Sequence, residues 1–172
     1  MALVWHREVK LVVVAVAALA AACPAHRVGS AGVTVALPTG WQELDPGPAP
    51  LAGQTDPVTR IVVGSAQIGF GKGCNDVDYA FPPTAVLIVV VEWTRPTPWA
   101  PKWPPRPRRF TPTALRVRPP PAIECFGGPG GSAEFADHGR RFAAFLLLGR
   151  RAPTALAARA RAVLDTLRIS PR

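Results

Sequence analysis

The stretch TAVLIVVVEW, residues 84–93, restricts the possible folds more than any other part of the chain. Every residue from Ala85 to Val91 is apolar, so a strand here presents apolar side chains to both faces of its sheet. Such a strand is central and covered on both sides. Residues 131–149 predict a hairpin that turns at Asp137-His138-Gly139, and its second strand, Phe142 to Leu148, is again almost wholly apolar. The fold therefore needs a sheet with two covered faces.

Two further strands are expected earlier in the chain. In residues 32–44 Val33 and Val35 alternate with polar or small residues, and the strand ends at Pro38 before a turn at Gly40. Residues 59–70 predict a second strand, in which Gly64 marks a bulge. Residues 45–57 are rich in Pro and Gly and predict a loop.

One amphipathic helix is expected, over residues 153–168. Its apolar residues recur at helical spacing, which places them on one face: Leu156, Ala160, Val163, Leu164 and Leu167. Pro153 is typical of a helix start, and Pro171 prevents continuation. The pattern predicts an α+β fold, a mainly antiparallel sheet of about five strands with this C-terminal helix on one face. One helix leaves the second face of the sheet to be covered by another part of the chain or by another molecule.

Residues 93–121, here called the arm, form the most biased segment. They contain ten prolines, seven basic residues and no acidic residue, and proline at this density excludes a helix or a central strand. Aromatic and basic side chains alternate along an extended backbone. Indoles favour a membrane interface, and guanidinium groups pair with phosphate.

Besides plain disorder of the arm, two interpretations of it remain open. In one, its tryptophans fold back over the uncovered face of the sheet and its arginines are only solvated. In the other, the arm binds an anionic membrane or polymer. Both hold together if the tryptophans point inward and the arginines outward. The candidate binding residues are Trp99, Lys102, Trp103, Arg106, Arg108 and Arg109.

The N-terminus predicts export. A weakly basic segment precedes the 12 uncharged apolar residues from Leu11 to Ala22, a length that suits a signal peptide and is too short to span a bilayer. We assign residues 1–22 to a signal peptide, 23–31 to a tether and 32–172 to a single domain. An uncleaved anchor or a buried first helix is the alternative. The sequence LAAAC resembles a bacterial lipobox, so Cys23 is the predicted lipid attachment site; cleavage without lipidation is the other possibility.

The chain has three cysteines, an odd count in an exported protein. If Cys23 carries lipid, Cys74 and Cys125 remain as a pair, and a disulfide between them stabilises the fold by about 4 kcal/mol in the chain-entropy model. Two buried thiols are the alternative, and metal ligation lacks companion ligands.

The charge is distributed unevenly. Residues 23–92 carry three basic and six acidic side chains, whereas residues 93–172 carry 15 basic and four acidic ones. This asymmetry favours an anionic partner. However, only three of the 20 basic residues are lysine, and the abundance of Arg, Ala, Pro and Gly is also what GC-rich codons produce.

Catalytic patterns are sparse, and we expect no enzyme activity, no metal and no cofactor. Asp137-His138 is explained by a hairpin tip, and NDVD (75–78) is too short for a calcium loop. GGPGGS (127–132) lacks the Lys-Ser/Thr of a phosphate loop. Glu92 is either a buried acid that an arginine pairs or, as we expect, a carboxylate in water at the end of a strand.

The segments LPTGW (37–41) and LDTLRI (164–169) resemble small exported proteins of actinobacteria, many of them lipoproteins of unknown function. More distantly, LPTGW is similar to the start of PsbP-like domains. That resemblance implies a sheet flanked by helices, no catalytic machinery and a role in binding or assembly.

Together these features predict a non-catalytic, exported lipoprotein on the outer face of the cell membrane, which acts as a binding or assembly factor for an anionic envelope polymer or a protein partner. A secreted soluble form is the alternative localisation, and no nucleic acid partner is expected. A carrier of a small apolar ligand, with a pocket on the second face of the sheet, is the alternative function, and a hydrolase ranks third.

Overall fold

The structure is a computed structural model that describes residues 26–45, 56–71, 78–95, 102–115 and 128–172, with the backbone alone for residues 69–71 and 78–80. The elements are β1 (His26–Ser30), β2 (Val33–Leu37), β3 (Gln42–Glu43), β4 (Val58–Gly64), β5 (Gly69–Gly71), β6 (Asp78–Ala80), β7 (Val86–Trp93), β8 (Gly130–Asp137), β9 (Arg140–Leu148), α1 (Thr154–Asp165) and β10 (Arg168–Ile169). The predicted signal peptide, Cys23, the Cys74–Cys125 disulfide and Trp99 lie outside the described residues.

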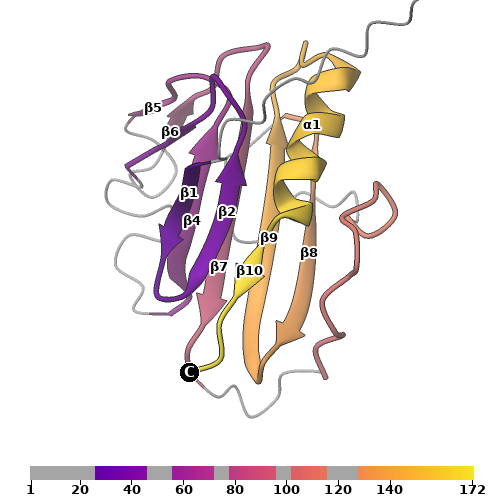
Figure 1. The fold of residues 1–172 in the computed structure, drawn as a ribbon. Helices are drawn as coiled ribbons and strands as arrows, with labels where there is room; N and C mark the ends of the chain where they lie inside the picture. The colour runs from indigo at the N-terminus through magenta and orange to yellow at the C-terminus, as the bar shows by residue number, and fades with distance from the viewer. Residues whose placement is uncertain (1–25, 46–55, 72–77, 96–101, 116–127) are drawn as a thin grey trace, which may run out of the picture.

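The main sheet has five antiparallel strands in the order β3-β4-β7-β9-β8 (Figure 1). With α1 it gives the α+β architecture that the sequence predicts. The β8–β9 hairpin turns at His138 and Gly139, whose φ angles are 48° and 71°. These positive φ angles define a two-residue hairpin turn, which confirms the predicted position.

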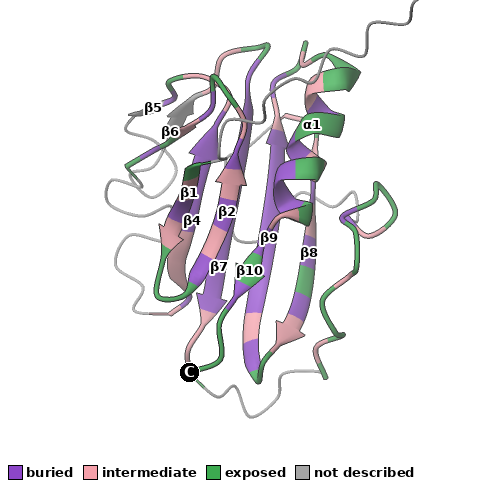
Figure 2. Cartoon of the chain, in the orientation of Figure 1, coloured by how far each residue is buried: buried purple, intermediate pink, exposed green. Residues whose placement is uncertain are grey.

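The predicted central strand, β7, lies between β4 and β9. Its side chains alternate between two cores: Val86, Ile88 and Val90 point to one face, and Leu87, Val89 and Val91 point to the other. All six are at most 1% exposed, and β9 is buried almost as fully (Figure 2). Both faces of the sheet are therefore covered, as an apolar strand of this length requires.

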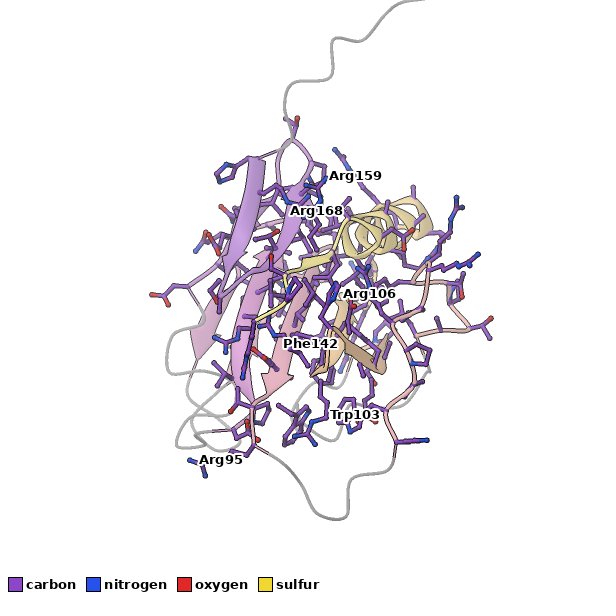
Figure 3. All side chains as sticks on the ribbon, turned by 60° about the horizontal axis from the view of Figure 1, so that its bottom comes forward. Arg95, Trp103, Arg106, Phe142, Arg159 and Arg168 are labelled. Carbon is purple, nitrogen blue, oxygen red and sulfur yellow. The ribbon has the colours of Figure 1, made fainter. Side chains whose placement is uncertain are left out.

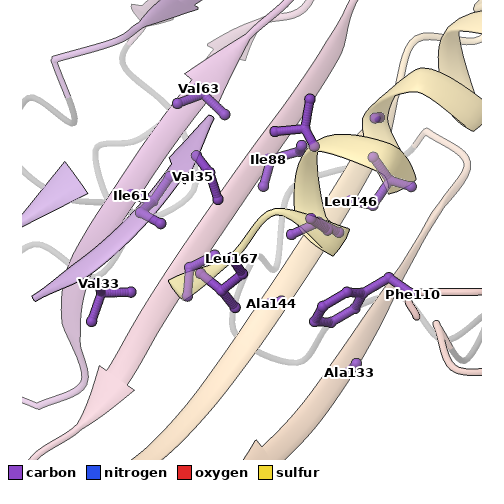
Figure 4. Packing of buried hydrophobic residues seen from close by; sticks show 14 of the residues in the cluster. Val33, Val35, Ile61, Val63, Ile88, Phe110, Ala133, Ala144, Leu146 and Leu167 are labelled. Carbon is purple, nitrogen blue, oxygen red and sulfur yellow. The ribbon is translucent and has the colours of Figure 1, made fainter. Parts of the chain in front are cut away.

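The first of these faces, here called the helix face, is covered by α1 and by a second sheet of three strands, β1-β2-β10 (Figure 1). α1 packs against β7 and β9, and β1 and β2 pack against β4. Figure 4 shows Val33 and Val35 of β2 beside Ile61 and Val63 of β4. This second sheet was not predicted from the sequence.

β1 occupies part of the segment that we assigned to a tether. His26–Ser30 pairs with β2, so the folded domain includes the second half of residues 23–31. The hairpin turns at Ala31 and Gly32, which have φ angles of 50° and 74°. Gly29 allows β1 to approach β2 closely, because a Cβ there would lie 2.2 Å from the Val33 carbonyl oxygen. β1 therefore has no apolar run that would mark it in the sequence, and its single glycine is required by its packing on β2.

The helix ends earlier than predicted, at Asp165, because Thr166 joins the small sheet. The Thr166 hydroxyl donates to the Val163 carbonyl at 2.7 Å and accepts the Ala36 N–H at 2.8 Å. The chain then continues as β10, which pairs with β2. The predicted apolar face of the helix is confirmed, since Ala160, Val163 and Leu164 are buried in the helix-face core.

Two predictions concern glycines of the N-terminal half, Gly64 and Gly40. Gly64 ends β4, and the irregularity in that strand lies between Thr59 and Ile61, so the predicted bulge at Gly64 was wrong. The turn predicted at Gly40 is present: the Trp41 N–H donates to the Pro38 carbonyl at 3.1 Å, and the Trp41 side chain is buried.

The opposite face of the sheet carries its own apolar core. Its buried members, each at most 4% exposed, are Leu44, Val62, Ile68, Leu87, Val89, Val91, Ala143, Phe145 and Leu147, with Phe81 packed against them. The loop residues Leu44, Ile68 and Phe81 thus contribute to the cover of a face for which the sequence showed no second helix.

Candidate functional site

The arm docks along the free edge of the main sheet. Pro105 forms a parallel bridge with Ala136 of β8. The Ala136 N–H donates to the Pro104 carbonyl at 2.7 Å, and the Arg106 N–H donates to the Ala136 carbonyl at 3.0 Å. Residues 102–115, here called the docked arm segment, therefore cover part of the edge strand without forming a regular strand. This agrees with the extended backbone that their prolines require.

Aromatic side chains of the docked arm segment point inward. Phe110 is 2% exposed, and its ring meets the ring of Phe135 edge to face at 5.8 Å between centroids. The Phe110 N–H donates to Asp165 Oδ1 at the end of α1, at 2.7 Å. Phe110 belongs to the core of the helix face (Figure 4), so this part of the arm covers that face.

Trp103 is half-buried beside Trp93, the last residue of β7, with 6.4 Å between ring centroids. By the alternation along β7, Trp93 points to the opposite face of the sheet. Trp103 therefore packs at the end of that face, as the inward-folded interpretation expected for the arm's tryptophans.

Arg106 anchors the arm to the rest of the domain. Its Nη1 donates to the Leu167 carbonyl at 2.6 Å, and its Nε lies 2.9 Å from Asp137 Oδ2. Figure 3 shows Arg106 on the side of the arm that faces the rest of the domain. These contacts fix the arm to β8 and to the end of α1. Lys102, Arg108 and Arg109 are exposed and remain as candidates.

A second group of charges lies at the end of β7. The Glu92 carboxylate is 1% exposed, so our expectation of a carboxylate in water was wrong. Its Oε2 accepts from Arg60 Nε at 2.7 Å and from Arg140 Nη2 at 2.8 Å. Its Oε1 accepts from Arg140 Nε at 2.8 Å and from Arg172 Nη2 at 2.7 Å. We call these four residues the Glu92 cluster.

The cluster keeps Glu92 ionised. Hydrogen bonds from Arg140 and then from Arg60 outweigh the effect of burial and lower the Glu92 pKa to about 2. The same contact raises the pKa of Arg140. Arg140 is itself buried, and it also donates to the Ser170 and Ala31 carbonyls at 3.1 and 3.2 Å. Its guanidinium lies 5.2 Å from the Phe142 ring centroid, a cation–π geometry.

A cavity of about 460 Å³, here called the basal pocket, opens beside this cluster. Its lining has three arginines and one carboxylate residue: Glu92, Trp93, Thr94, His138, Gly139, Arg140, Arg141 and Arg172. Arg141 donates to the Arg95 carbonyl, which holds the start of the arm against β9.

Asp56 fixes the same start of the arm from the β4 side. Its Oδ1 accepts from the Thr94 N–H at 2.5 Å and from the Thr94 hydroxyl at 2.7 Å. Burial alone would raise the Asp56 pKa, but the hydrogen bonds from Thr94 and Arg95 lower it. The wall of the basal pocket is thus held on both sides by polar contacts.

The Glu92 cluster was not predicted, although the sequence contains a signal for a buried carboxylate at this position. Glu92 follows Val86, Ile88 and Val90 at intervals of two residues, so the alternation of β7 places it on the covered helix face. A carboxylate there needs cationic partners. Which arginines would supply them depends on strand order and on the path of residues 168–172, which no local pattern reveals.

The other candidate features are His138, a metal site and a membrane-spanning helix. His138 lies at the tip of the hairpin, with Nε2 at 3.7 Å from Asp137 Oδ1. Among the described residues there is no group of three or more His, Cys, Asp or Glu side chains able to hold a metal. No helix in the same part of the chain is long and apolar enough to cross a bilayer.

Comparison of the chain with protein-family models, with curated proteins and with solved structures found no match.

Proposed function

We propose that the protein is a non-catalytic, exported binding factor of the cell envelope that contacts an anionic surface through its arm. One observation carries this proposal: the docked arm segment is fixed to the domain by Phe110 and Arg106, while Lys102, Arg108 and Arg109 face solvent. A basic segment that is already ordered loses less conformational entropy on binding than a flexible tail.

The distribution of charge supports the same function. The chain has a formal net charge of +9, and the excess of basic residues falls in the half that contains the arm. Basic residues near an anionic bilayer each contribute about 1 kcal/mol of attraction, which falls off within a Debye length. A lipid on Cys23 would hold the domain at such a surface, so that a modest attraction suffices to orient it.

The alternative function, a carrier of an apolar ligand on the opposite face, has less support. The nine residues of that core are at most 4% exposed, so a ligand would have to displace packed side chains. Co-purification of a lipid with the protein would favour the carrier.

Vesicle binding tests the proposal. The chain with Cys23→Ser, which cannot be lipidated, is mixed with vesicles of phosphatidylcholine alone or with phosphatidylglycerol. Binding to the anionic vesicles should weaken as the salt concentration rises from about 0.01 M to about 1 M. Arg108→Ala with Arg109→Ala should weaken binding at low salt by about thirtyfold, from about 1 kcal/mol for each charge.

The matched control is Arg150→Ala with Arg151→Ala, which removes the same charge from exposed positions between β9 and α1. The control should retain most of the binding. Salt-independent binding, or equal losses in the two double variants, would refute a contact through the arm.

A further inference from the structure

The Glu92 cluster, which lies beside the basal pocket, has more arginine than carboxylate side chains. Three guanidinium groups, from Arg60, Arg140 and Arg172, surround the single carboxylate of Glu92, which leaves two positive charges in excess. Arg140 and Arg172 of this cluster also line the basal pocket, whereas Arg60 does not. A structural ion pair needs one arginine for one carboxylate, so pairing alone does not account for this surplus at a cavity.

The arginines of the Glu92 cluster differ in how many of their N–H donors are already used. Arg140 uses Nε, Nη1 and Nη2 in contacts to Glu92, Ser170 and Ala31 and is buried. The Arg172 side chain is 62% exposed, and within the described part of the chain its Nη2 makes one contact, to Glu92. Since a guanidinium has five N–H donors, Arg172 can hold Glu92 and a second oxyanion at the same time.

From this geometry we infer that the basal pocket is a binding site for a phosphate monoester. A phosphate monoester carries a charge between −1.5 and −2 near neutral pH, which matches the surplus, and its three terminal oxygens suit the fork of a guanidinium. The cavity of about 460 Å³ is large enough for the phosphate and an attached organic group. Trp93 is also among the lining residues.

Two sources share this chemistry: a soluble phosphate monoester, and the headgroup of a lipid such as phosphatidic acid. The site is separate from the exposed basic residues of the docked arm segment. Its ligand carries two charges on one phosphate, whereas phosphatidylglycerol, a phosphodiester, carries one. The two sites can therefore be tested apart.

Calorimetric titration of the Cys23→Ser chain with phenyl phosphate tests the site, with benzoate as an aromatic anion of single charge. We expect phenyl phosphate to bind and benzoate to bind at least about tenfold more weakly, since one charge-assisted contact accounts for about that factor. Binding should also raise the midpoint of thermal unfolding, because a ligand of the native state stabilises it. No binding of phenyl phosphate or of phosphatidic acid, or equal affinity for benzoate, would overturn the proposal.

Arg172→Ala should weaken binding of phenyl phosphate about tenfold. Arg172→Lys should fall between this variant and the wild type, because it keeps the charge but not the fork. Arg168→Ala removes an exposed arginine from β10, outside the lining, and should bind like the wild type. Far-UV circular dichroism and the unfolding midpoint of each variant check that it is folded. Wild-type affinity in a folded Arg172→Ala variant would also overturn the proposal.

The two sources are distinguished by comparing phenyl phosphate in solution with phosphatidic acid in neutral vesicles. Binding of the first alone assigns a soluble ligand, and binding of the second alone assigns a headgroup. Arg108→Ala with Arg109→Ala should leave phenyl phosphate binding unchanged, and Arg172→Ala should leave binding to phosphatidylglycerol vesicles largely unchanged. Failure of one site thus does not decide the other.

Discussion

The buried charge of Glu92 restricts where several distant segments of the chain can lie. Burying an unpaired carboxylate costs several kcal/mol, so its position is stable only with cationic donors in place. Those donors come from β4, from β9 and from the segment after β10, through Arg60, Arg140 and Arg172. A single side chain at the end of β7 therefore connects segments that lie far apart in the sequence.

Glu92→Gln should destabilise the protein at neutral pH by about 3 kcal/mol, because it leaves the buried Arg140 guanidinium without its counter-ion. The folded-state pKa of Glu92 is about 2, below the value of 4.5 for an exposed glutamate. Its stabilisation is therefore complete above about pH 5 and is lost as the pH falls toward 2. The difference in free energy of unfolding between wild type and variant, measured by urea denaturation, should shrink over that range.

Glu134→Gln is the matched control, since Glu134 lies on β8 and is exposed. We expect a change within about 0.5 kcal/mol for this variant. A Glu92→Gln variant as stable as the control at pH 7, or a difference that does not change between pH 5 and pH 2, would contradict an ionised, stabilising carboxylate.

Gly149, directly after β9, leaves no room for a side chain. A Cβ there would lie 2.3 Å from the Pro83 carbonyl oxygen and 2.5 Å from that of Pro82, and backbone atoms cannot rotate away. Gly149→Ala should therefore cost about 3 kcal/mol. Gly40→Ala meets no atom within 4 Å and should cost about 1 kcal/mol for its φ angle of 81°. Thermal unfolding of both variants checks the order, and a smaller loss at Gly149 would contradict it.

Among the elements, the docked arm segment has a role in protecting β8. An edge strand with unpaired N–H and C=O groups is a template for association with another chain. Pro104 and Arg106 pair with Ala136, and the prolines on either side leave the outer edge of the arm with few donors. The prolines that prevent the arm from forming a regular strand thus also prevent a further strand from pairing with its outer edge.

Phe110→Ala should release this segment, because a buried phenyl ring contributes about 3 kcal/mol or more to its docking. Trypsin cleaves after Lys or Arg unless proline follows, so Arg108 and Arg109 are possible cleavage sites, while Arg106 is followed by Pro107. We expect cleavage at 108–110 to be much faster in Phe110→Ala than in the wild type, as read by mass spectrometry.

Phe110→Leu keeps an apolar side chain of similar depth and is the control. It should be cleaved at nearly the wild-type rate. Equal rates in all three proteins would show that the ring does not hold the arm.

The elements that the sequence predicted are those whose signal is local. The apolar run of β7, the turn at His138-Gly139 and the spacing of Ala160, Val163 and Leu164 each determine an element without reference to distant residues. β1 and β10 have no such local signal. β10 has only two residues, and Arg27 and Gly29 interrupt the apolar alternation that would indicate a strand at β1. Both exist because β2 lies beside them in the fold.

The candidate site likewise contains some residues that the sequence predicts and others that only the fold brings together. The outward basic residues of the arm, Lys102, Arg108 and Arg109, were visible in composition. The Glu92 cluster was not, because Arg60 and Arg172 are separated by most of the chain and meet only when the sheets are stacked. The anchoring contact of Arg106 was not predictable for a related reason, since its partner, the Leu167 carbonyl, lies beyond α1.

At the scale of the whole molecule, the Glu92 cluster fastens the small sheet to the main sheet. Arg140 of β9 donates to the Ala31 carbonyl at the β1–β2 turn and to the Ser170 carbonyl after β10, while Glu92 holds its guanidinium in place. The small sheet has three short strands, and one of them has only two residues. It should therefore open before the five-stranded sheet does.

Hydrogen exchange measured by mass spectrometry tests this order. Peptides from 86–93 and 142–148 should exchange slowest, since both strands are hydrogen-bonded on two sides and buried on two faces. Peptides from 26–37 and 168–170 should exchange faster, and Glu92→Gln should accelerate them more than it accelerates β9, because it frees Arg140 from its position. In Glu134→Gln the rates should stay as in the wild type. If Glu92→Gln instead raised exchange equally everywhere, the two sheets would unfold as one unit, and the cluster would stabilise the molecule without joining separable parts.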